Sequence, residues 1–264
     1  APIQANGLGH PVTSGLPAMT HALSSALMEP ADGERFYSER LVQLAGTASC
    51  YDGARLAGLI AAAPAPARSG DRIRYLCAQN LIKYLPRHDR VFAEIAAELP
   101  AAEFHFLGRD AREIAAFRTR LAEAFGRKGL ETERFCLFHG PLLPPDYIAL
   151  NRACDIFLDA ILWSGNNTTH EAVAAGLPVL TLPGPQMRGR HSLAVLTQMG
   201  MSETIARDLE DYIAMAVRAG RDAEWRRHLA AETERRRARL FDDPAPIRDL
   251  ERFIESALEA AEGR

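Results

Sequence analysis

The feature that most constrains this chain is a strand–loop–helix–strand unit at residues 156–184. A short apolar run at 156–158 leads into a loop rich in Gly, Asn and Thr, and an Ala-rich helix then extends to Gly176. Pro178 opens a second apolar run. The first N–H groups of a helix lack partners within it and its dipole is positive there, so this loop favours an anion. Glu171 follows within the helix, where its carboxylate can turn toward a ribose. The unit predicts a site for a nucleotide or a sugar phosphate.

Short apolar strands alternate with amphipathic helices from residue 72 onward, which predicts a parallel, doubly wound α/β sheet. The predicted strands are 73–78, 104–107, 135–138, 156–158 and 179–182. The predicted helices are 86–99, 110–125, 146–152, 169–175 and 191–199, with further helices after residue 208 and an amphipathic last helix at 245–261. Ligands of such sheets bind beyond the carboxyl ends of the strands. The polar loops that lie there are 79–83, 139–147, 164–171 and 184–190.

The part of the chain before residue 72 is less regular. It predicts a strand at 2–8, a loop at 9–15 and a weakly patterned segment after them. Residues 61–71 are rich in Pro and Ala and are typical of a linker or an insertion.

Composition excludes several classes of protein. The 264 residues are 47% hydrophobic and 25% charged, as in an average globular protein, and the net charge of −3 argues against nucleic acid as a partner. No apolar run is long enough to cross a bilayer, so we expect no membrane partner. The four cysteines form no C-x-x-C pair, which favours free thiols in a reducing cytosol, hence a cytoplasmic protein, over zinc or disulfides. The Arg-rich segment 224–240 predicts a solvated helix face.

Four motifs carry a resemblance to a known family. They are Ala1-Pro2-Ile3-Gln4 with Gly9-His10-Pro11-Val12-Thr13-Ser14-Gly15; Gln79-Asn80-Leu81-Ile82-Lys83; the run from Leu158 to Gly184; and Met187-Arg188-Gly189-Arg190 followed by a helix and Met199-Gly200. With Tyr37-Ser38-Glu39-Arg40, they make the chain resemble the catalytic region of the SPINDLY/O-GlcNAc transferase family, which are GT-B glycosyltransferases usually fused behind TPR repeats.

The resemblance implies an α/β fold of the GT-B type, a Rossmann-like doubly wound parallel sheet with flanking helices. It implies that the N-terminal half is largely missing, so that residues 1–65 are the terminal piece of that half with a linker. Residues 66–264 would be the nucleotide-sugar-binding Rossmann-like domain with its C-terminal helices. The last helix is expected to cross back toward the N-terminal half, as it does in GT-B folds.

The resemblance also implies roles for individual residues in the loops of this sequence. Lys83 matches the family lysine on the nucleotide diphosphate, where a fixed ammonium stabilises the charge that develops on the leaving group. Asn167, Thr168 and Thr169 match the loop that binds the pyrophosphate, and Glu171 matches an acidic residue on the ribose hydroxyls. Asn80 is the remaining donor-site residue of the second motif. The alternative is that Lys83 is an ordinary surface lysine and that Asn167, Thr168 and Thr169 are plain helix caps.

Other positions depart from the family pattern or leave alternatives open. Asn166 and Tyr147 stand where animal members have histidines, and the 142–145 run lacks the family's ribose-contacting lysine. Tyr147 either stacks on a base or caps the core, and His139 is a base-pocket candidate. His10 either contacts the sugar or acceptor as a catalytic residue, beside Lys83, or is solvated. Arg188 and Arg190 either meet phosphate or flank a helix start, whereas His170 is interpreted as structural.

The function implied is transfer of a sugar, from UDP-N-acetylglucosamine as the expected donor, to Ser or Thr hydroxyls of a protein or peptide acceptor. The reaction would be inverting and independent of a metal or cofactor, since no Asp-x-Asp motif is present. The alternatives are a UDP-sugar 2-epimerase-like enzyme of the same fold and a non-catalytic nucleotide-binding or interaction module. We expect this fragment alone to bind nucleotide weakly and to be inactive. We also expect self-association through exposed apolar surface near residues 1–60.

Overall fold

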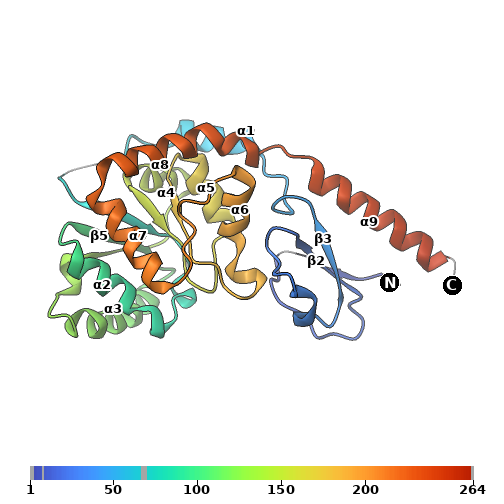
Figure 1. Cartoon of the computed structure of the whole chain (residues 1–264), viewed down its shortest axis with the longest axis horizontal. Helices are drawn as coiled ribbons and strands as arrows, with labels where there is room; N and C mark the ends of the chain where they lie inside the picture. Colours follow the sequence, from blue (N-terminus) through green and yellow to red (C-terminus); the bar gives the residue numbers. More distant parts are fainter. Residues whose placement is uncertain (1–2, 8, 67–69, 263–264) are drawn as a thin grey trace.

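The computed structural model describes residues 3–7, 9–66 and 70–262, which form two parallel sheets lying side by side (Figure 1). The C-terminal sheet has the order β6-β5-β4-β7-β8, and all its paired strands are parallel. Its strands are β4 (Ile73–Cys77), β5 (Ala102–Leu107), β6 (Cys136–His139), β7 (Ile156–Leu158) and β8 (Val179–Leu180). The chain order reverses between β4 and β7, so the sheet is doubly wound as predicted.

Helices cover both faces of this sheet, because successive residues of each strand point to opposite sides. Ile156 and Leu158 pack in one core cluster with helices α2 (Arg90–Glu98), α3 (Ala111–Gly126) and α7 (Leu209–Arg221). Phe157, between them, packs in a second cluster with helices α5 (Asn167–Ala174) and α6 (His191–Met199). Helix α4 (Pro144–Ala153) contacts α5 on that second face. The strand β7 is apolar on both sides, as expected for a strand of a parallel sheet between two helical layers.

The N-terminal sheet consists of three parallel strands, β1 (Ala5–Asn6), β2 (His21–Ser25) and β3 (Arg40–Leu44). The last helix, α9 (Ala245–Glu262), lies along this sheet, as expected for a GT-B fold (Figure 1). The ring of Phe253 lies 4.9 Å from that of His21, and Asp249 Oδ2 accepts a hydrogen bond from Ala45 N at 2.7 Å. A helix more than two hundred residues away in sequence therefore covers the N-terminal strands.

Sequence patterns located the C-terminal elements well and the N-terminal ones poorly. The strand predicted at 2–8 is reduced to β1. Residues 1 and 2 of the first motif and residue 8 of the predicted strand lie outside the described residues. Strands β2 and β3 and helix α1 (Gly53–Ala62) were not predicted. β2 combines His and Ser with apolar residues, and α1 contains two glycines, so neither carries a strong local pattern. The expected linker at 61–71 overlaps the end of α1, and residues 67–69 are not described.

The Arg-rich segment forms α8 (Ala223–Arg236) and the short helix η6 (Arg237–Leu240), and it is more than a solvated face. Arg236 donates to Gly200 O, Arg237 to Ala174 O, and Arg239 to Met199 O. These carbonyls lie at the C-terminal ends of α5 and α6, where a helix leaves acceptors without partners. The expected solvated face is correct for exposed arginines such as Arg227 but not for these three.

Cys77 and Cys136 are buried free thiols, as predicted, Cys154 is buried as well, and Cys50 is exposed. Among the described residues, we find no helix with the length and apolar character needed to span a bilayer.

Candidate donor site

The candidate site lies where the strand order of the C-terminal sheet reverses. The loop after β4 passes through Gln79 and Asn80 into the short helix η2 (Leu81–Lys83), and the loop after β7 leads into α5. Asn80 begins η2, and its side-chain oxygen accepts a hydrogen bond from Ile82 N at 3.2 Å. This cap holds Lys83 at the carboxyl ends of the two central strands, which is where ligands of doubly wound sheets bind.

Lys83 and Thr168 are connected through Gln79, although they belong to different loops. Lys83 Nζ donates to Gln79 Oε1 at 2.9 Å, and Gln79 Nε2 donates to Thr168 Oγ1. Gln79 is buried, so both bonds are sheltered from water. Burial lowers the pKa of Lys83, and the negative charge of Asp159 raises it. The structure therefore joins a cation and the N-terminal turn of α5 in one hydrogen-bonded unit.

An exposed indole, which the sequence analysis did not single out, lies between two cations. Lys83 Nζ is 5.8 Å and Arg188 Cζ is 6.0 Å from the ring centre of Trp163, whose exposed fraction is 40%. Arg188 is held in place because its carbonyl accepts a hydrogen bond from Ser164 N at 2.8 Å. Two cations around one exposed ring form a surface suited to an anionic ligand.

The loop at 164–169 is tightly held. Asn166 is the N-cap residue of α5, and its carbonyl accepts hydrogen bonds from Thr169 N and His170 N, each at 3.1 Å. Asn166 Oδ1 is buried and has no partner among the described residues. Thr169 is buried, and its hydroxyl donates to Gly165 O at 2.8 Å. Asn167 is exposed, so it is the most accessible residue of this helix start.

Glu171 of α5 acts by its charge on Tyr147 of α4. Burial raises the pKa of Glu171, and the nearby Arg55 of α1 lowers it. Burial, and then the charge of Glu171, raise the pKa of Tyr147 well above its usual value. The Tyr147 hydroxyl is buried and has no partner among the described residues, so the side chain points into the protein rather than out of it.

His139 and His10 belong to other elements than Lys83. His139 is at the end of the edge strand β6, where its Nε2 lies 2.9 Å from Nδ1 of His105, which in turn contacts Glu103 at 2.9 Å. Burial lowers the pKa of His139. His10 is exposed in the loop after β1, and its backbone N–H donates to Gly7 O at 3.1 Å within that loop.

Arg190 connects the two sheets. Its Nε donates to Met28 O at 2.8 Å and its Nη1 to Gly184 O at 3.4 Å. Met28, Met187 and Ala194 form a small buried cluster beside it. The loop that carries Arg188 is thus anchored to the segment after β2.

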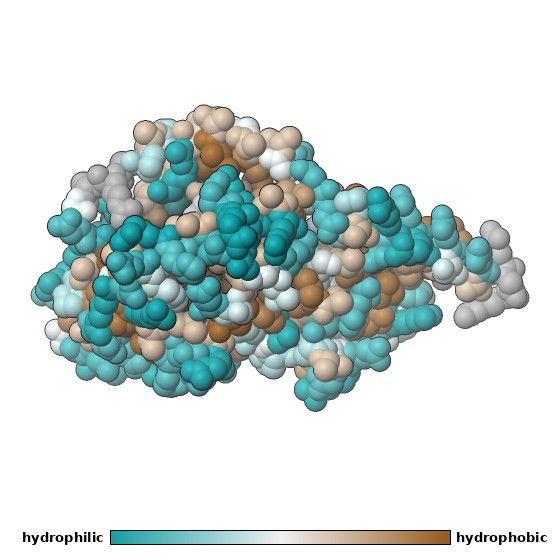
Figure 2. Space-filling view, turned by 45° about the horizontal axis from the view of Figure 1, so that its top comes forward, coloured by the Kyte–Doolittle hydropathy of each residue, from teal (hydrophilic) through white to brown (hydrophobic). Residues whose placement is uncertain are grey.

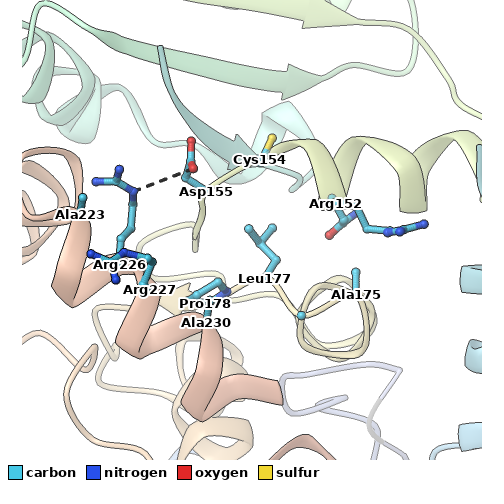
Figure 3. Close-up of a pocket in the computed structure, with 12 residues that line it drawn as sticks. Arg152, Cys154, Asp155, Ala175, Leu177, Pro178, Ala223, Arg226, Arg227 and Ala230 are labelled. Atoms are coloured by element: carbon cyan, nitrogen blue, oxygen red, sulfur yellow. Dashed lines mark ion pairs between the residues drawn. The ribbon is translucent and has the colours of Figure 1, made fainter. Parts of the chain in front are cut away.

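A separate hollow of about 340 Å³ lies between α4, α5 and α8 (Figure 3). Its lining includes Asp155 and Pro178, which directly precede β7 and β8, so it opens at the amino ends of these strands. Figure 3 shows Arg226 directed at Asp155 and Arg152 extending away from both. Because Lys83 and the 164–169 loop lie at the opposite ends of the strands, this hollow is distinct from the candidate donor site.

Comparison with known proteins agrees with this geometry. The family model described as Glycosyl transferase family 41 matches residues 69–249. A curated relative from Eustoma exaltatum subsp. russellianum, named a probable UDP-N-acetylglucosamine–peptide N-acetylglucosaminyltransferase SPINDLY, is 28% identical over 95% of this chain and 27% of its own length. The relative SEC from Arabidopsis thaliana, whose name gives the same probable activity, is 26% identical over 96% of this chain and 26% of its own length. The chain thus spans about a quarter of these relatives.

Among solved structures, a mutant of the Thermobaculum terrenum O-GlcNAc transferase superposes with a TM-score of 0.83 at 26% identity, over 99% of this chain and 49% of its own. A trehalose-phosphate synthase from Burkholderia vietnamiensis, at a TM-score of 0.57 and 14% identity over 92% of this chain and 61% of its own, shares the fold alone. These GT-B-like neighbours confirm the predicted fold class.

Proposed function

The chain belongs to glycosyltransferase family 41, and from this premise we propose that it binds a UDP-sugar, with N-acetylglucosamine as the sugar, for transfer to Ser or Thr hydroxyls of a protein or peptide acceptor. The names of the plant relatives and of the bacterial structural neighbour support this donor and this class of acceptor. Attack of the hydroxyl at the anomeric carbon would release UDP with inversion.

The observation that carries the proposal is the Lys83–Gln79–Thr168 connection at the start of α5. When the sugar leaves, negative charge grows on the diphosphate, and a fixed ammonium beside a helix N-terminus stabilises that charge. Lys83 is already oriented by Gln79, so little reorganisation is needed when the ligand binds. Arg188, near the same indole as Lys83, supplies a second positive group.

The other predicted residues receive roles by the same proposal. The N–H groups of Asn167 and Thr168 would receive phosphate oxygens, and Glu171 would accept ribose hydroxyls. The remaining predicted contacts are with the nucleotide-sugar at the edge of the site (Asn80, His139, Asn166) and with the sugar or acceptor (His10). Tyr147 and Thr169, which are also predicted to bind the nucleotide-sugar, have buried hydroxyls and would support the site from within the protein. Residues 1–65 would be the terminal piece of the N-terminal Rossmann-like half with a linker, and residues 66–264 the nucleotide-sugar-binding domain.

We further propose that this chain alone binds donor without turnover. Two titratable groups close to the site, Asp159 and His191, are buried and hydrogen bonded. Neither is placed to take a proton from an acceptor hydroxyl. Binding without transfer is also what a nucleotide-binding module would do, so transfer of labelled sugar to a Ser/Thr peptide by the purified chain would contradict this second proposal.

Calorimetry tests the donor site directly. UDP, UDP-N-acetylglucosamine and GDP are titrated into the wild type, Lys83→Ala and Lys128→Ala, the last being a matched control because Lys128 is exposed after α3, far from the site in sequence. UDP should bind in preference to GDP, and Lys83→Ala should weaken it by about tenfold or more, or about 1.4 kcal/mol. The proposal fails if none of the three nucleotides binds, or if both lysine variants bind UDP like the wild type.

A further inference from the structure

Asp159 is a buried carboxylate that the sequence analysis gave no role. It directly follows β7, and its exposed fraction is 3%. Its oxygens accept hydrogen bonds from Ser164 Oγ at 2.5 Å, Gly165 N at 2.8 Å and Thr181 Oγ1 at 2.8 Å. Burying a carboxylate is costly unless it is hydrogen bonded, so three donors around one group indicate a built arrangement.

These hydrogen bonds hold the beginning of the 164–169 loop. Ser164 Oγ accepts from Ser192 N at 2.8 Å, and Ser192 Oγ lies 2.8 Å from Thr169 Oγ1. The bonds extend from Asp159 through the loop to the first turns of both α5 and α6. All of these side chains are buried, so the loop is fixed before any ligand arrives.

Asp159 also acts on Lys83 by its charge. Lys83 is half-buried, which favours its neutral form, and the negative charge of Asp159 opposes that effect. For Asp159, burial raises the pKa, whereas the hydrogen bonds from Ser164, Gly165 and Thr181 lower it. Tyr84, Tyr212 and His191 are further titratable side chains here. Burial raises the pKa values of the two tyrosines well above their usual value and lowers that of His191 to about 4, so none of the three is charged near neutral pH.

We propose that Asp159 is a positioning residue, whose carboxylate fixes the 164–169 loop and keeps the Lys83 ammonium ready to receive a diphosphate. The identity of that ligand, a nucleoside diphosphate, rests on the proposed function. It predicts that Asp159 has two separable effects, one through hydrogen bonds and one through charge. A purely structural residue would have the first effect only.

The test compares Asp159→Asn with Thr181→Val by measuring UDP affinity between pH 7 and 10. Asp159→Asn keeps the shape and removes the charge, with its amide oxygen facing Gly165 N and its NH2 donating to the Ser164 and Thr181 hydroxyls, which can rotate to accept. Thr181→Val removes one hydrogen bond and keeps the charge. Affinity is lost as Lys83 deprotonates, so Asp159→Asn should move this loss to lower pH by about one unit. Thr181→Val should keep the wild-type midpoint. The inference is overturned if Asp159→Asn reduces affinity by the same factor at every pH, or not at all.

A second variant keeps the inference testable if Asp159→Asn does not fold. The double variant Ser164→Ala/Thr181→Val retains the carboxylate but removes two of its donors, which should raise the pKa of Asp159. Because the carboxylate stays charged above neutral pH while the loop loses two hydrogen bonds, UDP affinity should fall several-fold, by the same factor across pH 7 to 10, and wild-type affinity would overturn the inference. Lys83→Ala separates the two proposals: if it binds UDP like the wild type, the donor site itself is wrong, whatever the Asp159 variants do.

Discussion

The rings of Tyr51 and His170 lie parallel, 4.2 Å apart between centres and with 4° between their planes. Tyr51 precedes α1, and His170 lies in the first half of α5, directly after the 164–169 loop. Tyr51 also forms an isolated bridge with Phe241, after η6. The stack therefore joins the segment between the two sheets to the helix of the candidate donor site, which supports a structural role for His170.

Stability should fall in acid because His170 is buried as a neutral ring. Burial lowers its pKa to about 4, despite a hydrogen bond to Asn166 O that raises it. The neutral His170 ring contributes up to about 3 kcal/mol to the free energy of unfolding. This contribution is complete above about pH 6.5 and is lost as the pH falls toward 4. Urea denaturation of the wild type and His170→Phe at pH 4 to 8 checks this, since Phe retains the stack. A pH dependence that is identical in both proteins would contradict it.

Gly165→Ala should disrupt the donor loop. An added Cβ would lie 2.5 Å from Thr168 Oγ1 and 2.8 Å from Thr169 Oγ1, and closer still to Gln79 Nε2. We expect a loss of about 1–3 kcal/mol in the free energy of unfolding and weaker UDP binding. Gly58→Ala is the control, because its Cβ would meet no atom within 4 Å in the middle of α1. If the two variants behave alike, the loop is less tightly packed than described.

Trp163 should report on donor binding. The chain has two tryptophans, and Trp225 is 8% exposed beneath the guanidinium of Arg218. In Trp225→Phe, the fluorescence comes from Trp163 alone, so UDP should change its intensity or emission maximum by altering the two cations near the ring. Trp163→Phe should show no such change. A response that persists in Trp163→Phe would place the bound nucleotide elsewhere.

The docking of α9 should depend on Phe253. Its ring contacts His21 of β2, whereas the neighbouring Ile254 is an exposed residue. Phe253→Ala should reduce stability by about 1–2 kcal/mol, because the side chain is partly buried, and should accelerate proteolysis within 244–262. Ile254→Ala, the matched control, should leave the cleavage rate near that of the wild type. Equal rates in both variants would mean that α9 is held by other contacts.

Self-association through apolar surface near residues 1–60 remains a prediction, and α9, which contacts β3 in that part of the molecule, offers a surface on which to test it. Ile247, Ile254 and Leu258 are exposed on α9, and Figure 2 shows apolar side chains among hydrophilic ones over this part of the molecule. A groove of about 640 Å³ is lined by residues of this helix and of the N-terminal strands. Sedimentation velocity should detect concentration-dependent association that Ile254→Gln/Leu258→Gln reduces. A protein that is monomeric at all concentrations would refute the prediction.

The sequence by itself determined the C-terminal sheet and the position of its site. Apolar runs of strand length alternate with helices after residue 72, so β7 and α6 were predicted at their observed bounds. The loops that carry Lys83 and Thr168 followed from their places after strands, because the carboxyl ends of parallel strands meet at one edge. The roles predicted for these two residues came from the family resemblance. Such patterns are local, because they depend on how apolar residues repeat along a short stretch of chain.

Only the tertiary structure decided which side chains act together. Asp159 is held by Thr181, Arg190 by Met28, and His139 pairs with His105, all across segments that are distant in sequence. β2 and β3 were missed for a related reason, since their strand state depends on pairing with each other and on cover from α9. Hydrogen bonds and burial depend on distances in space, and no periodicity along the chain encodes them.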